Sequence, residues 1–499
     1  MDTFAGGGFI PLEALRLGCE AFASDLNPVA CLILKVMLED IPRWGRQKIK
    51  VKRQNGKEVE AEGLVEALRI VGKEIKEKAE QELKDFYPDE PDGAKPIAYL
   101  WARTVRCESP NCGAEIPLMR SFWLCKKATR KRALRHNVVR PYSGPPQVEF
   151  EIFEPRADKE VHGGTVTRAK ATCLCCGTVL PPERVRAQLS EQRGGADTVF
   201  DIKGNRTGGA RILAVVTLHY GIQGRSYRLP ARRDYQSVWK AQELLKAILD
   251  EWERGDKRGV CPVPDELLPV ERMKGSSGFR VLLYGMRTFS DVFNARQKMI
   301  LIGLMKLFAD QDNKLPPLQL SKIIRHCNTV SFWHKGSETV AGAFGRQALP
   351  MCWDYPEYNP VSPYAGGLQD SLDDFVEAVK HINASSLRIG QVNNADATEN
   401  PLPDNSGDIW FTDPPYYDAI AYADLLDFFM VWLRRVIRDK SLLRDIFEPS
   451  NRLSPKEREA IQDPGRLSGG GPKNRAFYET VMAPSVPMIV RHLPLEKLV

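Results

Sequence analysis

The chain has 499 residues, of which 43% are apolar and 27% charged, and its mean hydropathy is −0.34. This composition is typical of soluble proteins with room for two or three domains, and it excludes collagen-like, coiled-coil and wholly disordered chains. No stretch approaches the roughly 18–20 uninterrupted apolar residues of a membrane span, and no secretory signal pattern is present, so we expect no membrane partner. Eleven cysteines in such a chain favour reduced thiols, a metal site and a cytoplasmic location over a disulfide framework.

Positive charge is concentrated in one segment. The whole chain has 71 Lys and Arg against 64 Asp and Glu. Residues 101–240 alone have 25 Lys and Arg against 12 Asp and Glu, so the rest of the chain is slightly acidic. An excess of this size within one segment favours a polyanionic partner over an ordinary solvated surface.

Periodicity and turn residues predict the elements in chain order. In the first part of the chain we expect a glycine turn at 6–8, a helix over 10–17, a strand over 19–24 followed by a second helix, and a charged amphipathic helix over 60–86. In the middle we expect a hairpin of 211–220 with 224–230 and helices over 236–254 and 289–309. Towards the end we expect a loop over 350–370, a helix over 370–382, a strand over 409–412 and an apolar helix over 419–438.

Three glycines, Gly6 to Gly8, precede the first expected helix. Glycines at this place allow a tight turn and a close approach of the backbone to a ligand at the helix N-terminus. Seventeen residues after Gly8, Asp25 ends the next expected strand, where a doubly wound nucleotide-binding sheet places an acid that accepts hydrogen bonds from ribose. Together these features favour a cofactor loop over an ordinary turn.

The motif Thr412-Asp413-Pro414-Pro415-Tyr416-Tyr417 follows the expected strand at 409–412. Two consecutive prolines hold the chain in a rigid extended turn that lacks backbone donors. The Asp413 carboxylate and the Pro414 carbonyl can then accept the two N–H groups of an exocyclic amine, while Tyr416 offers a flat face for its ring. Tyr417 is expected to contribute packing. We interpret this motif as a binding site for a planar amine rather than as a structural Pro-Pro turn.

With these two motifs, the sequence resembles the S-adenosylmethionine-dependent amino methyltransferases, and specifically the DNA adenine-N6 methylases. The stretches 10–30, 346–360 and 412–433 are similar to bacterial adenine-specific methylases that contain a zinc ribbon. The resemblance implies a Rossmann-like methyltransferase sheet, S-adenosylmethionine as cofactor, and a role in restriction-modification or phage defence. Residue by residue, it implies a cofactor site of Asp2, Phe4, Gly6, Gly8, Asp25 and Asp396 and a catalytic site of Asp413, Pro414 and Tyr416.

Two short-spaced cysteine pairs, Cys107 with Cys112 and Cys173 with Cys176, are each followed by a glycine. This pattern is typical of two zinc knuckles that supply four thiolates to one structural zinc ion. Cys175 is the alternative ligand in the second pair. Cys125, His136 and His162 lie between the pairs and are further alternatives, each more readily explained as structural or exposed. The separation of about sixty residues requires an insertion between the two knuckles.

Basic residues lie between and after the knuckles, where phosphate contacts are their natural use. Because this insertion lies between the cofactor loop and the catalytic turn, it is the candidate target-recognition region, with an exposed loop as the alternative. The candidate nucleic-acid-binding residues are Lys126, Lys127, Arg130, Lys131, Arg132, Arg135, Arg225 and Arg228. Trp353, Asp354, Glu357 and Asn359 have no assigned chemistry.

We therefore expect an α/β methyltransferase domain that is split by a large α+β zinc-containing insertion. The expected parts are a cofactor-binding part (1–95), the basic zinc-binding insertion (96–240), a helical region with a loop (241–380) and a catalytic part (381–499). The expected function is methylation of adenine N6 in DNA. The alternatives are an RNA amino-methyltransferase and a nucleic-acid-binding scaffold that has lost turnover.

The expected sheet is short at both ends. Only Met1 precedes Asp2, although the first strand of such a sheet needs roughly five apolar residues. After 419–438, only 487–493 has the pattern of a strand. We therefore expect either a partner chain that completes the sheet or a longer methylase, and weak cofactor binding by this chain alone.

Overall fold

The computed structural model describes residues 1–53, 56–219, 221, 224–273, 278–309, 316–362, 366–384, 386–399, 401–417, 420–437, 439, 441–468 and 471–484. By their contacts these residues form two compact units, each assembled from separate stretches of chain. Unit 1 comprises Met1–Ile75, Leu307–Ser321 and Ser371–Val499, and unit 2 comprises Lys76–Lys306 and Lys322–Asp370. The expected strand at 487–493 lies outside the described residues.

Unit 1 contains short parallel strands. Strand β1 (Phe22–Asp25) pairs in parallel with β20 (Gln391–Asn394), and Asp2 pairs in parallel with Ala23 on the other edge of β1. The α-amino group of Met1 donates to the Ile409 carbonyl at 2.7 Å, and the Phe411 amide donates to the Met1 carbonyl at 3.0 Å. The spatial order is therefore β20, β1, Met1–Asp2 and 409–411.

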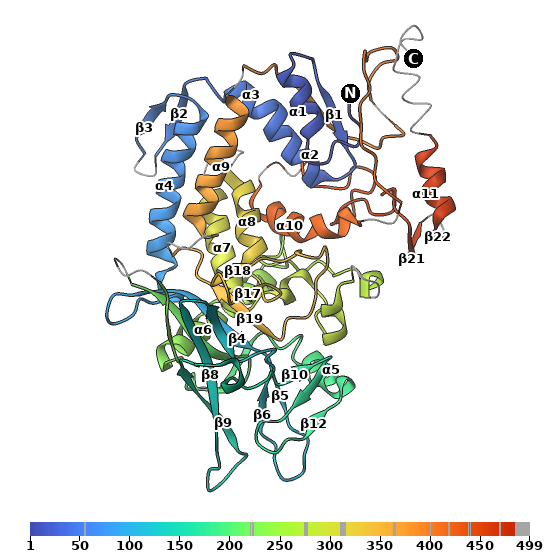
Figure 1. Cartoon of the computed structure of the whole chain (residues 1–499). Helices are drawn as coiled ribbons and strands as arrows, with labels where there is room; N and C mark the ends of the chain where they lie inside the picture. Colours follow the sequence, from blue (N-terminus) through green and yellow to red (C-terminus); the bar gives the residue numbers. More distant parts are fainter. Residues whose placement is uncertain are drawn as a thin grey trace. The chain divides into compact units, whose positions relative to one another are not determined.

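Helix α2 packs against β1 and β20 in unit 1, and α1 lies nearby (Figure 1). Helix α2 begins at Pro28 with Asn27 as its N-cap, which accepts from the Val29 amide, and it continues into a π-helical turn at Val36–Asp40. The helices are α1 (Phe9–Arg16), α2 (Pro28–Lys35), α3 (Ile41–Trp44), α4 (Leu64–Glu82), α9 (Leu368–Asn383), α10 (Tyr422–Val436) and α11 (Arg475–Met482); α4 and α9 extend beyond the unit. The hairpins are β2 (Ile49–Lys52) with β3 (Glu58–Ala61) and β21 (Asp463–Ser468) with β22 (Gly471–Lys473).

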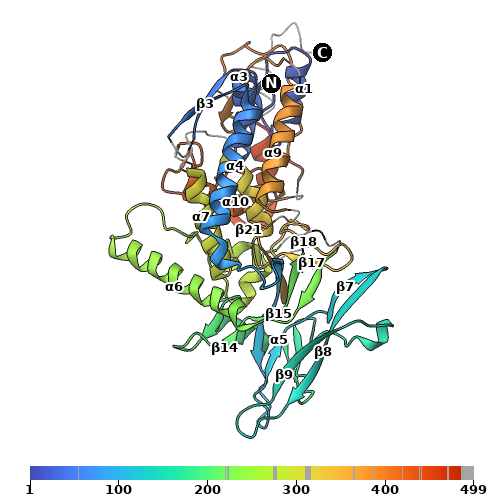
Figure 2. The same ribbon diagram turned by 90° about the vertical axis from the view of Figure 1, so that its left-hand side faces the viewer.

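Two apolar clusters hold unit 1 together. The first packs α1 and α2 against β1 through Leu12, Leu15, Ala23 and Leu34. The second packs one face of α4 against α9, which lie side by side in both views (Figures 1 and 2). The expected helix at 60–86 and helix at 370–382 are therefore confirmed, with boundaries that differ by a few residues.

Unit 2 contains a four-stranded antiparallel sheet in the order β16, β15, β4, β19. Its strands are β4 (Lys95–Ala102), β15 (Arg211–Leu218), β16 (Ser226–Arg228) and β19 (Asp354–Tyr358). The expected hairpin of 211–220 with 224–230 is confirmed, apart from turn residues outside the described part. The expected loop at 350–370 is wrong in part, because Asp354–Tyr358 is a mostly buried strand. Pro356 is tolerated there because β19 is an edge strand.

Smaller sheets and helices complete unit 2. The second sheet, β7–β8–β9, is a long twisted ribbon (Figure 2). The remaining strands are β5 (Thr104–Arg106), β6 (Glu115–Pro117), β7 (Trp123–Lys127), β8 (Arg130–Val139), β9 (Gln147–Phe153), β10 (Val166–Thr167), β11 (Lys170–Thr172), β12 (Val179–Leu180), β13 (Thr198–Phe200), β14 (Arg206–Gly209), β17 (Phe332–His334) and β18 (Thr339–Ala341). The helices are α5 (Pro182–Glu191), α6 (Arg232–Arg254), α7 (Ala295–Ala309) and α8 (Leu320–His326), with ends of α7 and α8 in unit 1.

A buried ion pair lies in the core of unit 2. The Arg296 guanidinium donates two hydrogen bonds to Glu357, and neither side chain is exposed to solvent. Tyr87, Trp101 and Asn294 donate three more to the same carboxylate. Because every acceptor of this buried charge is engaged, the pair avoids the cost of an unsatisfied ion. Glu357, which had no assigned chemistry, is thus a structural residue. The chain is a mixed α/β protein with small sheets.

Candidate functional site

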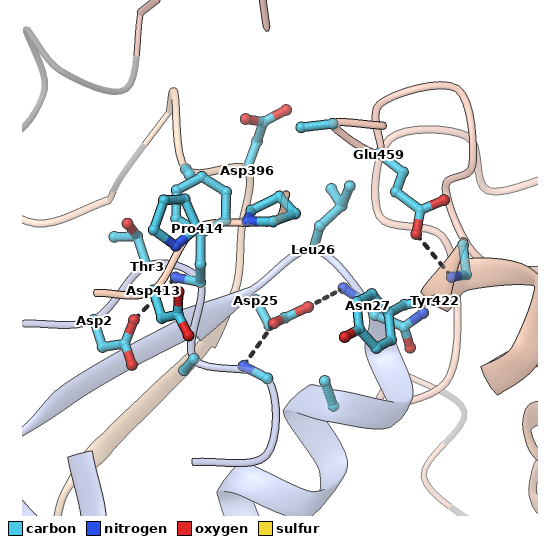
Figure 3. A pocket seen from close by; sticks show the side chains of 18 of the residues that line it. Asp2, Thr3, Asp25, Leu26, Asn27, Asp396, Asp413, Pro414, Tyr422 and Glu459 are labelled. Carbon is cyan, nitrogen blue, oxygen red and sulfur yellow. Dashed lines mark hydrogen bonds between the residues drawn. The ribbon is translucent and has the colours of Figure 1, made fainter. Parts of the chain in front are cut away.

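A pocket of about 580 Å³ lies within unit 1, at the ends of its parallel strands. This volume is within the range that small-molecule ligands occupy. Five carboxylates line it, and all five are labelled in Figure 3. They are Asp2, Asp25, Asp396, Asp413 and Glu459. The expected cofactor loop and the expected catalytic turn therefore line one pocket, although more than four hundred residues of sequence separate them.

Asp25 shapes the glycine loop. Its two carboxylate oxygens accept hydrogen bonds from the Gly6 amide at 2.9 Å and the Asn27 amide at 2.8 Å (Figure 3). Burial raises the pKa of Asp25, while these backbone hydrogen bonds lower it. A carboxylate has about four acceptor sites, so Asp25 retains capacity for a ribose hydroxyl.

Gly8 packs closely against Leu34 in α2 and Met37 in the turn that follows it. Its φ is 78°, and a Cβ there would lie 2.1 Å from Met37 Cε and 2.7 Å from Leu34 Cδ2. The left-handed backbone and the close side chains of Met37 and Leu34 together favour glycine at this position. Phe4, the other expected loop residue, lines the pocket and donates its amide to Asp2 at 3.1 Å.

Asp2 links the glycine loop to the turn at Asp413–Tyr416. Its Oδ1 accepts from the Thr412 hydroxyl at 2.7 Å, and Thr412 directly precedes Asp413. Burial raises the pKa of Asp2, with the Thr412 hydrogen bond acting in the opposite direction. Asp2 therefore fixes the two halves of the pocket against each other.

The turn at Asp413–Tyr416 leaves two acceptors free. Asp413 Oδ1 accepts from the Tyr416 hydroxyl at 3.1 Å, whereas the second oxygen has no hydrogen-bond partner among the described residues. Within the same described part of the chain, the Pro414 carbonyl also accepts no hydrogen bond, while the Pro415 carbonyl accepts from Tyr478 at 2.7 Å. The Tyr416 side chain is 69% exposed. A planar amine can thus find two acceptors and an aromatic face at this turn.

Asp396 lines the pocket but is already engaged. Its Oδ1 accepts from the amide and hydroxyl of Thr398, at 2.9 and 2.7 Å. Its Oδ2 accepts from Arg458 at 3.2 Å. The local hydrogen bonds give Asp396 the loop-capping role, and contact with a cofactor adenine stays a prediction.

Sequence reasoning missed one wall of the pocket. Residues 454–460 and the first turns of α10 line it, including Tyr422, Arg458 and Glu459. The Glu459 carboxylate accepts from the Ala423 amide at 2.9 Å and so caps α10 (Figure 3). No sequence motif in 454–460 indicates that these residues line the pocket. The only signal is that charged residues such as Arg458 and Glu459 follow the apolar helix α10 in the sequence.

The four expected metal ligands converge in unit 2. The Sγ atoms of Cys107, Cys112, Cys173 and Cys176 all lie within 4.8 Å of one another. Two of the pairs are separated by 3.6 and 3.7 Å. Tetrahedral coordination at a Zn–S distance of 2.3 Å requires about 3.8 Å between sulfurs, so the cluster fits a zinc ion. The prediction of a four-cysteine site is confirmed as a cluster that could hold a metal.

The alternative metal ligands lie outside this cluster. Cys175 is buried beside it, and burial raises its pKa to about 11. Cys125 donates to the Arg130 carbonyl at 3.3 Å. His136 and His162 contact each other edge to face beside Phe122, with ring centroids 5.1 Å apart. These three residues therefore have local structural roles.

Most expected nucleic-acid-binding residues form ion pairs within unit 2. Arg130 pairs with the buried Glu338 and donates to the Arg225 carbonyl at 2.8 Å. Arg225 in turn donates to the Ser337 carbonyl at 3.4 Å. The other pairs are Lys126–Asp158 (2.6 Å), Lys127–Glu338 (2.6 Å), Arg132–Glu154 (2.8 Å), Arg135–Glu151 (2.8 Å), Arg228–Glu90 (2.6 Å) and Arg228–Asp234 (2.7 Å). Lys127, Arg130 and Arg228 neutralise buried carboxylates, and phosphate binding by this set stays a prediction.

No family model, no curated protein and no solved structure matches the chain. In the part of the chain that the structure describes, no helix combines the length and apolar composition of a membrane span. The site is therefore interpreted from its own residues and contacts.

Proposed function

We propose that this chain transfers a methyl group from S-adenosylmethionine to the N6 amine of adenine in DNA. One observation carries the proposal: Asp413 Oδ2 and the Pro414 carbonyl are free acceptors beside an exposed tyrosine, in the same pocket as the glycine loop. This arrangement matches the two N–H donors and the flat ring of an aromatic amine.

The order of the parallel segments supports a cofactor site of the Rossmann-like kind. In a doubly wound sheet with the order 3-2-1-4, ligands bind at the carboxyl ends of the strands, where the order reverses. Segments β20, β1, Met1–Asp2 and 409–411 correspond to these four strands, and the reversal falls between the last two. The pocket lies at this point.

The charge of the pocket also suits this cofactor. Asp2, Asp25 and Asp413 form no ion pair with a cation among the described residues. A positively charged sulfonium would offset part of the cost of these carboxylates. When bound, S-adenosylmethionine supplies an electrophilic methyl group. The glycine loop and Asp25 would hold it.

Asp413 and Pro414 would activate the target nitrogen. The lone pair of an exocyclic adenine amine is delocalised into the ring, which makes the nitrogen a weak nucleophile. Hydrogen bonds from both of its N–H groups to Asp413 and Pro414 favour tetrahedral geometry and localise that lone pair. Positioning and electrostatics would supply most of the catalysis. Because a paired base is out of reach, the adenine must leave the duplex and stack on Tyr416.

The four cysteines would hold a structural zinc ion, and the closed tetrathiolate set leaves no open coordination position for catalysis. Unit 2 carries this site together with the basic segment. We propose that unit 2 contributes to target binding through residues such as Lys131 that are not committed to internal ion pairs.

The test is methyl transfer from radiolabelled S-adenosylmethionine to DNA and to RNA. We expect transfer to DNA, and its loss in Asp413→Ala. The matched control is Asp374→Ala on the exposed part of α9, which lies outside the pocket and should retain activity. Transfer to RNA alone would support the RNA amino-methyltransferase. Absence of transfer to either, together with salt-sensitive DNA binding, would support a binding scaffold and overturn the proposal.

A further inference from the structure

Helix α11 contacts the turn at Asp413–Tyr416 within unit 1. The Tyr478 hydroxyl of α11 donates to the Pro415 carbonyl at 2.7 Å, and the Tyr478 ring packs against the ring of Tyr417, with the two centroids 4.6 Å apart. The Tyr417 hydroxyl donates in turn to Glu479 of α11 at 2.9 Å. Helix α11 is therefore joined to this turn by a backbone carbonyl and by the aromatic side chain that follows it.

Helix α11 is not part of the core of unit 1. None of its eight residues is buried, and it packs on β22 at the surface (Figure 1). Arg475 and Glu479 form an ion pair at 2.9 Å, with side chains that are 75% and 56% exposed, and exposed pairs of this kind add little to stability. The Arg475 guanidinium also lies 5.3 Å from the centre of the Tyr417 ring. These contacts indicate a local role of α11 at the turn.

The proline rings make the Tyr478 hydrogen bond an effective restraint. The ring of Pro415 fixes its φ at about −65°, so only its ψ is free to vary between the Pro414 and Pro415 carbonyls. Because Tyr478 binds the Pro415 carbonyl, it restrains this dihedral and with it the direction of the Pro414 carbonyl. In the described part of the chain, the Pro414 carbonyl is the one that accepts no hydrogen bond.

Different parts of unit 1 fix the two ends of the turn. On the N-terminal side, the Thr412 hydroxyl donates to Asp2 at 2.7 Å. On the C-terminal side, the Gln462 amide donates to the Tyr417 carbonyl at 2.8 Å, and α11 adds its own contacts. The last two residues of α11 line the pocket, whereas Tyr478 does not.

We propose that Tyr478 is a positioning residue for methyl transfer. It holds the Pro414 carbonyl in the direction from which this carbonyl accepts the target amine, and it acts through the turn because it lies outside the pocket lining. Glu479 supports it by holding the Tyr417 ring on which Tyr478 packs. The inference rests on the proposed function for the reaction, whereas the restraint on the turn depends only on these contacts.

The first measurement is the steady-state kinetics of Tyr478→Phe, which removes the hydroxyl and keeps the ring that packs on Tyr417. We expect kcat for methyl transfer to DNA to fall about fivefold to tenfold, because one hydrogen bond that orients the Pro414 carbonyl is lost. KM for S-adenosylmethionine should stay unchanged, because the glycine loop is intact. The unfolding temperature should also stay unchanged, because α11 has no buried residue.

The matched control is Tyr355→Phe in the core of unit 2. It removes the same kind of hydrogen bond, which runs from the buried Tyr355 hydroxyl to the Ala196 carbonyl at 3.0 Å. Because this bond lies in the core and outside the pocket, the control should lower the unfolding temperature and leave kcat unchanged. A structural role of Tyr478 would give the pattern of the control.

The second measurement needs no reaction. The Gln462 amide is bound to the Tyr417 carbonyl, so its hydrogen exchange in the ligand-free chain reports how firmly the turn is held. Tyr478→Phe should accelerate this exchange by about fivefold. The Phe411 amide, bound to the Met1 carbonyl before the turn, should exchange as in the unaltered chain.

Faster exchange at Gln462 together with a lower kcat would support the proposal. Unchanged exchange would overturn it whether or not the chain transfers methyl groups, and so would an unchanged kcat in an active chain. Failure of the proposed function gives a different result: faster exchange at Gln462 in a chain without any methyl transfer would support the restraint by Tyr478 and refute the function.

Discussion

Gly8 connects backbone conformation to ligand binding most directly. In Gly8→Ala, the new Cβ must clash with Met37 and Leu34 while the backbone stays left-handed. We expect a loss of about 2–4 kcal/mol in the free energy of unfolding, from about 1 kcal/mol of backbone strain and 1–3 kcal/mol of overpacking. Displacement of the loop should also weaken binding of S-adenosylmethionine. Chemical denaturation and calorimetry measure the two effects.

The control for this prediction is Gly18→Ala at the other end of α1. Gly18 has a similar φ of 86°, but nothing lies within 4 Å of its added Cβ. It should show the strain of about 1 kcal/mol alone and leave ligand binding intact. An equal loss of unfolding free energy in both variants would mean that the contact of Gly8 with Leu34 and Met37 does not contribute to stability.

Ligand binding should depend on pH through Glu459. Burial raises the pKa of its carboxyl to about 7; Asp424 also raises it, while Lys473 and Arg466 lower it. Protonation of Glu459 removes a negative charge from the pocket wall, so affinity for the positively charged S-adenosylmethionine should fall as pH drops below 7. The limiting slope is tenfold per pH unit for one proton. Binding titrations between pH 5.5 and 8.5 measure it, and Glu459→Gln should abolish the dependence. An equal slope in that variant would assign it to another group.

At the scale of residues, the sequence predicted those site members that belong to compact motifs. Asp25 is recognisable because a glycine turn and a strand end define its position, and Asp413 because two prolines follow it. Glu459 and Arg458 belong to no motif, and their placement depends on how 454–460 folds back on α10 and Asp396. Such tertiary contacts between distant segments leave no local pattern in a single sequence.

Among the elements, the two cysteine pairs of the four-cysteine cluster lead to a prediction about bound metal. Cys107→Ser should reduce the metal content from about one zinc per chain to none and destabilise the neighbouring short strands, because structural zinc sites contribute folding free energy directly. Cys175→Ser should retain the metal, since Cys175 lies outside the four-cysteine cluster. Elemental analysis and thermal unfolding measure both. Loss of zinc in Cys175→Ser would make that residue a ligand.

The β7–β8 ribbon combines residues with two different roles. Arg130 pairs with the buried Glu338, which Lys127 and Tyr227 also contact, so Arg130→Gln should cost about 1–3 kcal/mol of stability by weakening the compensation of a buried carboxylate. Lys131 forms no ion pair in the described part of the chain, so Lys131→Glu should leave stability unchanged. We expect it instead to weaken nucleic-acid binding and reduce the salt dependence, because one phosphate contact is lost. An unchanged salt dependence of binding would mean that Lys131 is exposed to solvent in the complex and contacts no phosphate.

Helices and strands were predictable where apolar residues recur with a regular period over several turns, or where a glycine or proline marks the end of the element. Helices α1 and α10 and the hairpin β15–β16 follow from such patterns. Strand β19 was missed because Pro356 and its neighbouring tyrosines are typical of loops, yet edge pairing with β4 leaves the proline nitrogen without a required partner. A proline is tolerated in this strand because the strand lies at the edge of the sheet. A local sequence pattern does not show where in a sheet a strand will lie.

At the scale of the whole molecule, the chain divides into two units, and unit 1 comprises segments from the start, middle and end of the sequence. The glycine loop and the turn at Asp413–Tyr416 line one pocket, as expected for two motifs of one kind of site. The sequence did not predict that Leu307–Ser321 also belongs to unit 1, since a short stretch of ordinary composition carries no signal of its partners. Composition alone identified the basic segment as a separate part of the chain. It did not indicate that Leu307–Ser321 belongs with the two ends of the chain.

Hydrogen exchange provides a test of the assembly of unit 1. Saturating S-adenosylmethionine should slow amide exchange in segments that are far apart in sequence but line the same pocket, namely 3–8, 25–27, 396–398, 413–416 and 458–460. Exchange in β4 and β15 of unit 2 should stay unchanged. Removal of the metal by a chelator should instead accelerate exchange around 104–118 and 165–180, because the two cysteine pairs lose the metal ion that they share. Protection confined to 3–8, with 413–416 unaffected, would contradict a common pocket and would separate cofactor binding from the turn at Asp413–Tyr416.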